Sequence, residues 1–361
     1  MKIGILTRRY GYNMGSTLQA YAIGEMIKEC GHSVEIIDYD ETSAHRYWRI
    51  RPFIEHIFFY MHIPPFGSKR EYLDHRIRQE RRFNKFETTY LPLTAISYSS
   101  PKELNKIASK YDKIVVGSDQ IWNPFLFDSN FFGGFLNEEE RNKIIPYAPS
   151  IGTSDIETIH QEQRQLLKSL NILACREEIG AKIINEITGR KVAVVLDPTL
   201  MISTNKWEYL ANVHKFDIPN KRYILTYFLG NNIPDDEIKK QCKIENAEVI
   251  NISMFNRPNG LKANFQAKDV GPGEFLYLIK NALYVLTDSF HATIFSWIFK
   301  RNFTVFERFN SSDIQNQNSR IYTLLRILGC EGRLYGGNLK DSEPLFNNAK
   351  KISLEYLHSN L

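Results

Sequence analysis

Short apolar runs rich in β-branched residues recur along the chain, and each run leads through polar residues and glycine into an amphipathic stretch. Such alternation predicts parallel strands joined by crossover helices. We expect strands at residues 2–6, 33–38, 113–119, 144–150, 171–176, 192–196, 223–229, 248–253, 284–287 and 303–306. We expect helices at residues 16–29, 69–86, 161–170, 235–243, 273–282 and 292–299. The pattern therefore predicts an α/β fold.

The length of 361 residues suits two domains of roughly 150 to 200 residues better than one core. The run that ends at Asp197 and Pro198 closes the first half, because proline restrains the residue before it. We expect a Rossmann-like domain at 1–200 and a second one, with a C-terminal segment, at 201–361. Two such halves facing a cleft suggest the GT-B arrangement, with ligands at the carboxyl ends of the strands. A single larger doubly wound sheet is the alternative.

Charge and cysteine spacing limit the expected partners. The formal net charge is +5, and no nucleic-acid-binding module accompanies it, so we expect no nucleic acid partner. The four cysteines lie far apart, without a CxxC pair or a histidine at ligand spacing, which indicates neither a metal site nor a disulfide framework. The strand-like start KIGILT lacks a signal peptide pattern, and free thiols suit a reducing cytosol. We therefore expect a cytoplasmic protein.

Residues 45–86 are the most basic part of the chain, with ten Lys or Arg against four acidic residues. Aromatic residues such as Trp48, Phe58 and Phe59 lie near its first arginines. This mixture suits an anionic bilayer surface, so peripheral contact with the inner face of a membrane is one hypothesis. An aromatic flap packed over the protein is the other. No stretch is apolar over the roughly 20 residues that a spanning helix needs.

The first loop, RRYGYNMGSTLQAYA, follows a strand and opens a helix. Free backbone amides and the positive end of a helix dipole can bind an anion or a polar sugar group there. Asn13, Gly15 and Gln19 are the candidate binding residues of this loop. The spacing matches neither the P-loop nor GxGxxG, so nucleotide binding is not specifically indicated. The alternative is a glycine-eased turn with Ser16 or Thr17 as the helix cap.

The segment LYVLTDSFHATIF places polar residues where another strand gives way to a helix. His291 there can transfer protons near neutral pH, while Ser289, beside Phe290, and the helix-terminal amides can hold a phosphate or carboxylate. The alternative makes Asp288 or Ser289 a helix cap and His291 a surface residue of the first turn.

Two further strand ends carry candidate residues. Arg176 follows the apolar run NILA and lies where a strand gives way to a helix. Its guanidinium offers a planar fork for carboxylate or phosphate, or it simply pairs with Glu177, Glu178 or Asp197. In GSDQIWN, the side chains of Asp119, Gln120 and Asn123 can bind sugar hydroxyls while Trp122 packs against a sugar ring. The alternative there makes Asp119 a helix cap and Trp122 a core residue. The sequence shows neither a carboxylate pair spaced as in a glycosidase nor a GxSxG nucleophile elbow, so hydrolysis is not indicated.

Several short stretches occur in one characteristic order, namely STLQAYA, VVGSDQIWN, YAPSIG, CREEIGAKII, VLDPTLM, TDSFHATIFSWIF, NFTVFER and the triplet NSR at 318–320. Together they resemble the polysaccharide pyruvyl transferase family. The resemblance implies a GT-B-like fold and transfer of a pyruvyl group from phosphoenolpyruvate to a hexose, forming a pyruvate ketal and releasing phosphate. It further implies an acceptor that is often a lipid-linked repeat unit of a cell-surface polysaccharide, and no cofactor besides the donor substrate.

By motif position, the resemblance makes His291 the donor-site histidine and Arg176 the arginine that faces the donor phosphate or carboxylate. It implies a donor held against residues 201–361 and an acceptor held against residues 1–200. The substrate-binding residues would be Ser289, Phe290, Asn13, Gly15, Gln19, Asp119, Asn123, Asn318 and Arg320.

Two other functions remain open at this stage, because a shared fold does not specify chemistry. A GT-B glycosyltransferase would bind a nucleotide-sugar. A non-catalytic protein that binds a sugar or a lipid carrier would bind its ligand without releasing phosphate.

Overall fold

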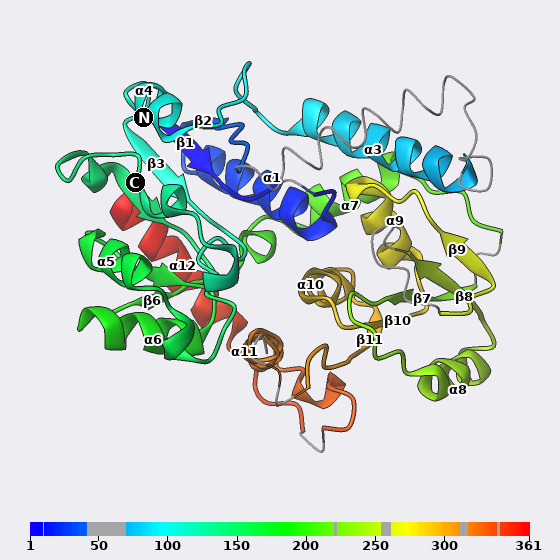
Figure 1. Cartoon of the computed structure of the whole chain (residues 1–361). Coiled ribbons are helices and arrows are strands. Elements are labelled where there is room, and N and C mark those ends of the chain that lie inside the picture. The colour runs from blue at the N-terminus through cyan, green and yellow to red at the C-terminus, as the bar shows by residue number, and fades with distance from the viewer. Residues whose placement is uncertain are drawn as a thin grey trace.

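The computed structural model describes residues 1–9, 11–41, 70–219, 222–253, 261–310, 313, 317–337 and 340–361, with only the backbone at 70–73. Two large parallel sheets, each flanked by helices, form two halves of the molecule, and a short third sheet belongs to the first half (Figure 1). The predicted α/β class with two Rossmann-like halves is confirmed. The alternative of one larger doubly wound sheet is wrong, because the described strands form separate sheets.

The first sheet has the strand order β2-β1-β3-β4, and all of its pairs are parallel. The helix after its first strand, α1 (Met14–Glu29), begins two residues before the predicted start because Asn13 caps it. The Asn13 side chain accepts hydrogen bonds from the backbone N–H groups of Gly15 and Ser16. The strands are β1 (Lys2–Leu6), β2 (Ser33–Ile36), β3 (Lys113–Val116) and β4 (Ile144–Pro146).

The second sheet has the order β11-β10-β7-β8-β9 and is also parallel throughout. Every residue of its central strand β7 (Tyr223–Tyr227) is buried, as expected for a strand covered by helices on both faces. The other strands are β8 (Glu248–Ile252), β9 (Phe265–Ala267), β10 (Tyr284–Thr287) and β11 (Asn302–Val305), and the helices are α8 (Asp235–Glu245), α9 (Pro272–Asn281) and α10 (Phe290–Ile298). The three-residue strand β9 was not predicted, because so short a run carries no periodic signal.

The short third sheet pairs β5 (Ala174–Cys175) with β6 (Ala193–Val194). Helix α5 (Gln161–Ser169) agrees with the prediction, and α6 (Glu178–Thr188) follows Arg176, where a strand was expected to give way to a helix. Four other helices were not predicted: α4 (Pro101–Ala108), α7 (Thr204–Val213), α11 (Ser319–Leu328) and α12 (Phe346–Asn360). The last helix returns to the first half of the chain. The Ser353 hydroxyl accepts a hydrogen bond from the Leu196 N–H at 2.9 Å, and the Tyr356 hydroxyl donates to the Pro146 carbonyl at 2.7 Å.

Aromatic packing fixes how the two halves meet. Trp207 of α7 is fully buried and lies between Tyr21 of α1 and Phe295 of α10, with ring centroids 5.6 and 4.9 Å away. All three rings contribute to one hydrophobic core that includes residues from both sheets. The start of α1 is thereby held against the start of α10, which matters for the site described below.

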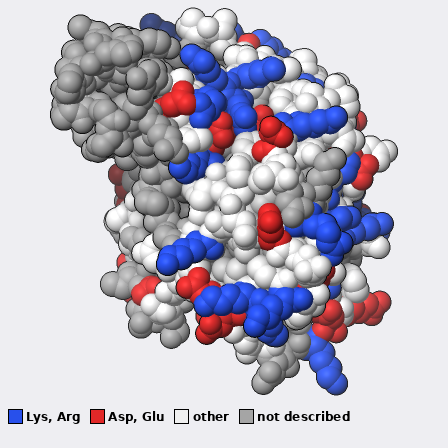
Figure 2. Space-filling view, turned by 90° about the vertical axis from the view of Figure 1, so that its right-hand side faces the viewer, with Lys and Arg blue, Asp and Glu red and all other residues white. Residues whose placement is uncertain are grey.

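The basic segment is described only in part. Helix α3 (Arg70–Tyr90) confirms the predicted helix at 69–86 and ends four residues later, while residues 45–69 lie outside the described residues. Arg78 and Arg82 of α3 pair with Asp269 of the second half at 3.0 and 3.7 Å, so part of its charge is neutralised within the protein. Figure 2 views the molecule from the right-hand side of Figure 1 and shows basic and acidic side chains interleaved over that face. None of the described helices has the length and apolar character needed to cross a bilayer.

Candidate functional site

A cleft of about 870 Å³ lies between the two halves, at the carboxyl ends of their strands. Residues that follow β1 and β3 line it from the first half, and residues that follow β7, β10 and β11 line it from the second. The lining from the first half includes Arg8, Asn13, Ser16, Asp119, Gln120 and Asn123, and that from the second includes Asn231, Ser289, Phe290, His291, Arg308, Gln317 and Arg320. The polar strand ends that the sequence singled out after β1, β3 and β10 therefore meet in one cleft.

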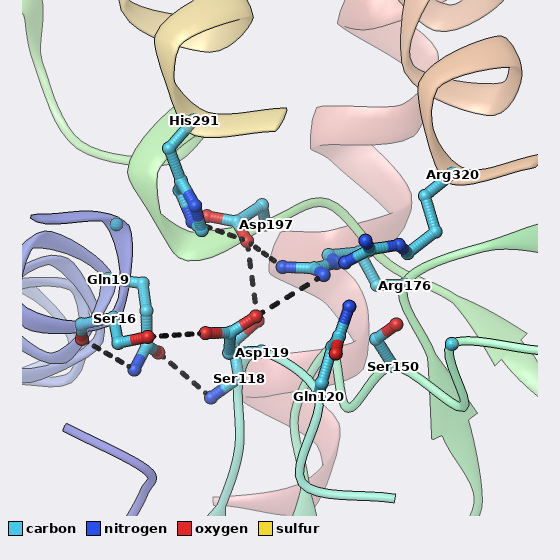
Figure 3. A network of polar contacts seen from close by, with 12 residues as sticks. Ser16, Gln19, Ser118, Asp119, Gln120, Ser150, Arg176, Asp197, His291 and Arg320 are labelled. Atoms are coloured by element: carbon cyan, nitrogen blue, oxygen red, sulfur yellow. Dashed lines mark hydrogen bonds and ion pairs between the residues drawn. The ribbon is translucent and has the colours of Figure 1, made fainter. Parts of the chain in front are cut away.

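His291 lies in the first turn of α10 and lines the cleft with only 8% of its surface exposed. Ser289 caps this helix, its hydroxyl accepting from the Ala292 N–H at 3.4 Å. One edge of the imidazole rests on Gly15 of α1 so closely that a Cβ atom at Gly15 would lie 2.0 Å from His291 Nδ1. The other nitrogen, Nε2, lies 3.7 Å from Asp197 Oδ2 (Figure 3) and has no hydrogen-bond partner in the part of the chain that the structure describes. Both ends of the ring are thus positioned by the opposite half of the molecule.

His291 belongs to a charged cluster, which we define as Asp119, Arg176, Glu177, Asp197 and His291. Its centre is the Arg176 guanidinium, which lies 2.7 Å from Asp197 and 3.6 Å from Asp119 (Figure 3). A third carboxylate, that of Glu177, lies 4.0 Å away. Arg176 follows β5 and precedes α6, as the sequence predicted. Arg176 pairs with Glu177 and Asp197, as the alternative interpretation of this residue proposed. These ion pairs are buried beside the cleft and are not surface ion pairs.

The two aspartates of the charged cluster remain ionised. Burial tends to raise the pKa of Asp197, but the nearby His291 and Arg176 outweigh it and hold this pKa far below its usual value. Burial likewise opposes the ionised form of Asp119, whereas the charge of Arg176, followed by His291 and the Ser16 hydrogen bond, lowers its pKa. Negative charge is therefore fixed next to the His291 imidazole.

Residues in the first two turns of α1 hold this cluster in place. The Ser16 hydroxyl donates to Asp119 Oδ2 at 2.6 Å (Figure 3). Gln19 is fully buried, donates to the Thr7 hydroxyl at 2.7 Å and accepts from the Ser118 N–H at 3.0 Å. The predicted binding residue Gln19 thus lies under the cleft, where its contacts are with the protein.

Arg320 lines the cleft and lies close to Arg176, with 8% of its surface exposed. Its hydrogen-bond partners are neutral amides. Nη2 donates to Gln317 Oε1 at 2.6 Å. Nη1 donates at 2.5 Å to the side-chain oxygen of Gln120, when the Gln120 amide is oriented with its oxygen toward Arg320. Burial, together with the positive charge of Arg176, lowers the pKa of Arg320 to about 9. Arg320 therefore carries a positive charge at neutral pH that no paired carboxylate balances among the described residues.

Asn318 organises the loop that follows β11. Its side chain accepts from the backbone N–H groups of Arg308 and Phe309, both at 3.3 Å, and donates to the Phe309 carbonyl at 2.7 Å. The residue is buried, with 4% of its surface exposed. Asn318 thus holds Arg308 at the cleft, and Arg320 of the same NSR triplet lines the cleft itself.

The GSDQIWN stretch divides between cleft and core. Asp119 and Asn123 line the cleft, and the Asn123 side chain also accepts from the Phe125 N–H at 2.9 Å. Trp122 is fully buried, donates to the Phe131 carbonyl at 3.1 Å and stacks on Phe132. The interpretation of Trp122 as a sugar platform is therefore wrong, and its alternative as a core residue is correct.

Sequence reasoning missed two arginines of the cleft. Arg8 follows β1 and binds the Glu41 carboxylate through Nε at 2.7 and 2.9 Å. Arg308 follows β11 and lies 3.5 Å from Asp288. Their positions just beyond strand ends were a usable signal, since the carboxyl ends of parallel strands share one edge of a sheet. Among the described residues, no group of three or more His, Cys, Asp or Glu side chains could hold a metal ion.

Comparison with known proteins agrees with this architecture. A family model described as polysaccharide pyruvyl transferase matches residues 13–310. The UDP-GlcNAc 2-epimerase of Methanocaldococcus jannaschii is similar over 99% of this chain and 99% of its own, with 16% identity and a TM-score of 0.52. The UDP-GlcNAc 2-epimerase of Neisseria meningitidis, solved bound to UDP-GlcNAc, is similar over 99% of this chain and 100% of its own, with 12% identity and a TM-score of 0.51. These likenesses concern the fold alone and confirm the GT-B-like arrangement, and no curated protein sequence gives a significant match.

Proposed function

The chain belongs to the polysaccharide pyruvyl transferase family, and we propose that it moves a pyruvyl group from phosphoenolpyruvate to a hexose of a lipid-linked polysaccharide repeat unit. One observation carries the proposal beyond the family. Among the described residues, the Nε2 of the buried His291 imidazole has no hydrogen-bond partner, and Arg320, which lines the same cleft, has no paired carboxylate. Such a site combines a proton donor with a place for an anion.

The reaction needs one proton donor and a stable position for departing phosphate. A proton added to the methylene carbon of phosphoenolpyruvate makes the neighbouring carbon electrophilic, and a sugar hydroxyl bonds to that carbon. A second hydroxyl then displaces phosphate by breaking the bond between this carbon and the phosphate ester oxygen. Of the two hydroxyl protons, one replaces the proton given to the new methyl group and the other leaves with phosphate. The products are the ketal and inorganic phosphate.

His291 is the proposed proton donor. Asp197 lies 3.7 Å from its Nε2 and Gly15 packs against the other edge of the ring, so the imidazole has a fixed place at the cleft from which it can give a proton to a substrate. Arg176 keeps Asp197 and Asp119 ionised and in position. We therefore assign proton transfer to His291 and charge stabilisation within the site to Arg176.

Amide side chains support a sugar as the acceptor. Each amide both donates and accepts hydrogen bonds, as a hydroxyl-rich ligand requires. Phe125, 41% exposed at the cleft, can face the apolar side of a sugar ring. The amides that line the cleft are Asn13, Gln120, Asn123, Asn231, Asn232, Asn310 and Gln317.

We also propose that the protein works at the cytoplasmic face of a membrane, which residues 45–86 would contact, because a lipid-linked acceptor is anchored there. Liposome flotation tests this step. Co-flotation with anionic vesicles but not with neutral ones is expected. Failure to float with either kind of vesicle would leave the transferase proposal intact and remove the membrane contact.

Phosphate release from phosphoenolpyruvate tests the transferase proposal directly. Purified protein is incubated with the donor and a panel of lipid-linked or aryl hexosides, with His291→Ala as the control. Release that requires an acceptor and falls by about 100-fold or more in the variant is expected. Binding of a nucleotide-sugar without any release would instead favour the glycosyltransferase function.

A further inference from the structure

We propose that Glu80 of α3 is a positioning residue for proton transfer, and that it acts through the Tyr12 hydroxyl on the start of α1 and so on His291. The inference rests on the proposed function, because it concerns the proposed proton donor. Among the described residues, those that line the cleft include neither Glu80 nor Tyr12, so both act without touching substrate. Helix α3 can have this role because it extends over both halves of the molecule (Figure 1).

The middle of α3 is docked on the second half. Gln79 is buried, and its side chain donates to a backbone carbonyl of the second half at 3.0 Å. Arg78 and Arg82, on either side of it in the sequence, lie 3.0 and 3.7 Å from the Asp269 carboxylate. Glu80 stands between these contacts on the helix. Its position is therefore fixed relative to the second half.

The carboxyl-terminal part of α3 packs on the first half. Phe83 and Phe86 are almost fully buried, and the Phe86 ring lies 6.3 Å from that of Tyr21 in α1, measured between centroids. Glu87 binds Arg9, which follows β1, at 2.6 Å. Helix α3 thus joins both halves, and any contact that it makes with the start of α1 relates α1 to the second half.

Glu80 makes such a contact through Tyr12. The Tyr12 hydroxyl donates to Glu80 Oε1 at 2.7 Å, and the Tyr12 ring meets Phe83 edge-on with centroids 5.4 Å apart. Burial, followed by this hydrogen bond, raises the pKa of Tyr12, so the phenol keeps the proton that it donates. A carboxylate acceptor makes the hydrogen bond stronger than one between neutral groups.

The backbone at Tyr12 makes the start of α1 sensitive to this hydrogen bond. Tyr12 has a φ of 54°, in the left-handed region that residues other than glycine seldom adopt. Such a conformation persists only where the surrounding contacts hold it. The next residue, Asn13, caps α1, and its side chain accepts from the N–H groups of Gly15 and Ser16. A change at Tyr12 therefore reaches the first turn of α1.

The first turn of α1 in turn fixes the place of His291. Gly15 touches the imidazole so closely that an added Cβ atom would lie 2.0 Å from Nδ1. Because this contact leaves no spare room on one side, a small shift of α1 either pushes the ring or removes its support. Misplacing a reacting group by about 1 Å can lower a rate by about 100-fold. We therefore expect the Tyr12–Glu80 hydrogen bond to affect turnover through the position of the ring.

Kinetics of acceptor-dependent phosphate release test the role. Tyr12→Phe removes the hydroxyl and keeps the ring against Phe83, so kcat should fall by roughly 10-fold while the KM for phosphoenolpyruvate stays within about twofold. Glu80→Ala should lower kcat equally. Glu80→Gln, whose amide oxygen can still accept from the phenol, should recover most of the loss. The double variant Tyr12→Phe/Glu80→Ala should be no slower than either single variant, because both remove the same contact.

Tyr111→Phe is the matched control. The Tyr111 hydroxyl donates to Glu35 Oε2 at the same 2.7 Å, but Tyr111 precedes β3 and so lies at the edge of the first sheet opposite the cleft. This variant should lower the melting temperature about as much as Tyr12→Phe does and keep the wild-type kcat. An equal loss of kcat in the two variants would overturn the inference, because it would reduce the effect of Tyr12 to general stability.

NMR of the imidazole nitrogens reports the position of His291 without any turnover. The chain has nine histidines, and His291→Ala assigns the signals of this ring by their absence. Tyr12→Phe should shift or broaden those signals, and Tyr111→Phe should leave them in place. Unchanged His291 signals in Tyr12→Phe, or a kcat within about threefold of a turning-over wild type, would overturn the inference. Displaced signals in a protein that never releases phosphate from phosphoenolpyruvate would uphold the positioning role and refute pyruvyl transfer.

Discussion

The contact between Gly15 and His291 leads to a sharp prediction about turnover. Replacing Gly15 by alanine adds a single methyl group at the start of α1, where a Cβ atom would lie 2.0 Å from His291 Nδ1 and 2.5 Å from Cγ. Real Cβ atoms make ordinary contacts at 3.4 Å or more, so the imidazole has to move by about 1 Å or adopt another rotamer. Either change takes Nε2 away from its place near Asp197.

The expected cost falls mainly on catalysis. Misplacing a reacting group by about 1 Å can lower a rate by about 100-fold, so we expect kcat to fall by that order. Overpacking of this kind costs about 1–3 kcal/mol in stability, and the better helix propensity of alanine offsets up to about 1 kcal/mol of it. Gly15 is helical and has no left-handed backbone, so the methyl group itself is the only source of strain.

Acceptor-dependent phosphate release and a thermal melt of the same preparation make up the assay. Gly24→Ala is the control, because Gly24 lies in the same helix and an added Cβ there meets nothing within 4 Å. The control should keep wild-type turnover and melt at the same temperature or slightly higher. A Gly15→Ala protein that melts cooperatively and turns over within threefold of the wild type would refute the role of this contact.

Two further predictions concern charge. Asp197→Asn should lower the free energy of unfolding by about 3 kcal/mol in urea at pH 7, because it removes a buried partner 2.7 Å from Arg176. Since the folded-state pKa of Asp197 is depressed, this deficit should be complete above the usual aspartate pKa of about 4 and shrink as pH falls below it; a deficit that does not depend on pH would contradict the assignment. Burial and the positive charge of Arg176 lower the pKa of Arg320 to about 9, an effect to which Arg308 adds and which Glu177 and Asp119 oppose. The KM for phosphoenolpyruvate should therefore rise as pH passes through about 9. Arg320→Gln should show no such rise, and an identical pH profile in both proteins would exclude Arg320 as the titrating group.

Much of the architecture could be predicted from local sequence. The long buried strands and the helices after them were predicted within a few residues, because apolar runs and their polar ends are encoded by neighbours in the chain. Helix α7 was missed although its apolar residues have helical spacing, and β9 and α4 were too short to stand out. The boundary near residue 200 stays a prediction, and α12 packs beside the first half although it follows the second.

The sequence by itself determined which residue types stand at the ends of the strands. His291, Arg176, Asp119 and Arg320 could all be selected from it, because strand ends and family motifs are local features. Only the tertiary structure decided what each of them does. Arg176 and Arg320 are the same residue type, yet one is enclosed by carboxylates and the other faces the cleft among neutral amides. The Phe290 ring over Arg176 and the Gln120 amide beside Arg320 come from segments more than 100 residues away along the chain, and no local pattern encodes such contacts.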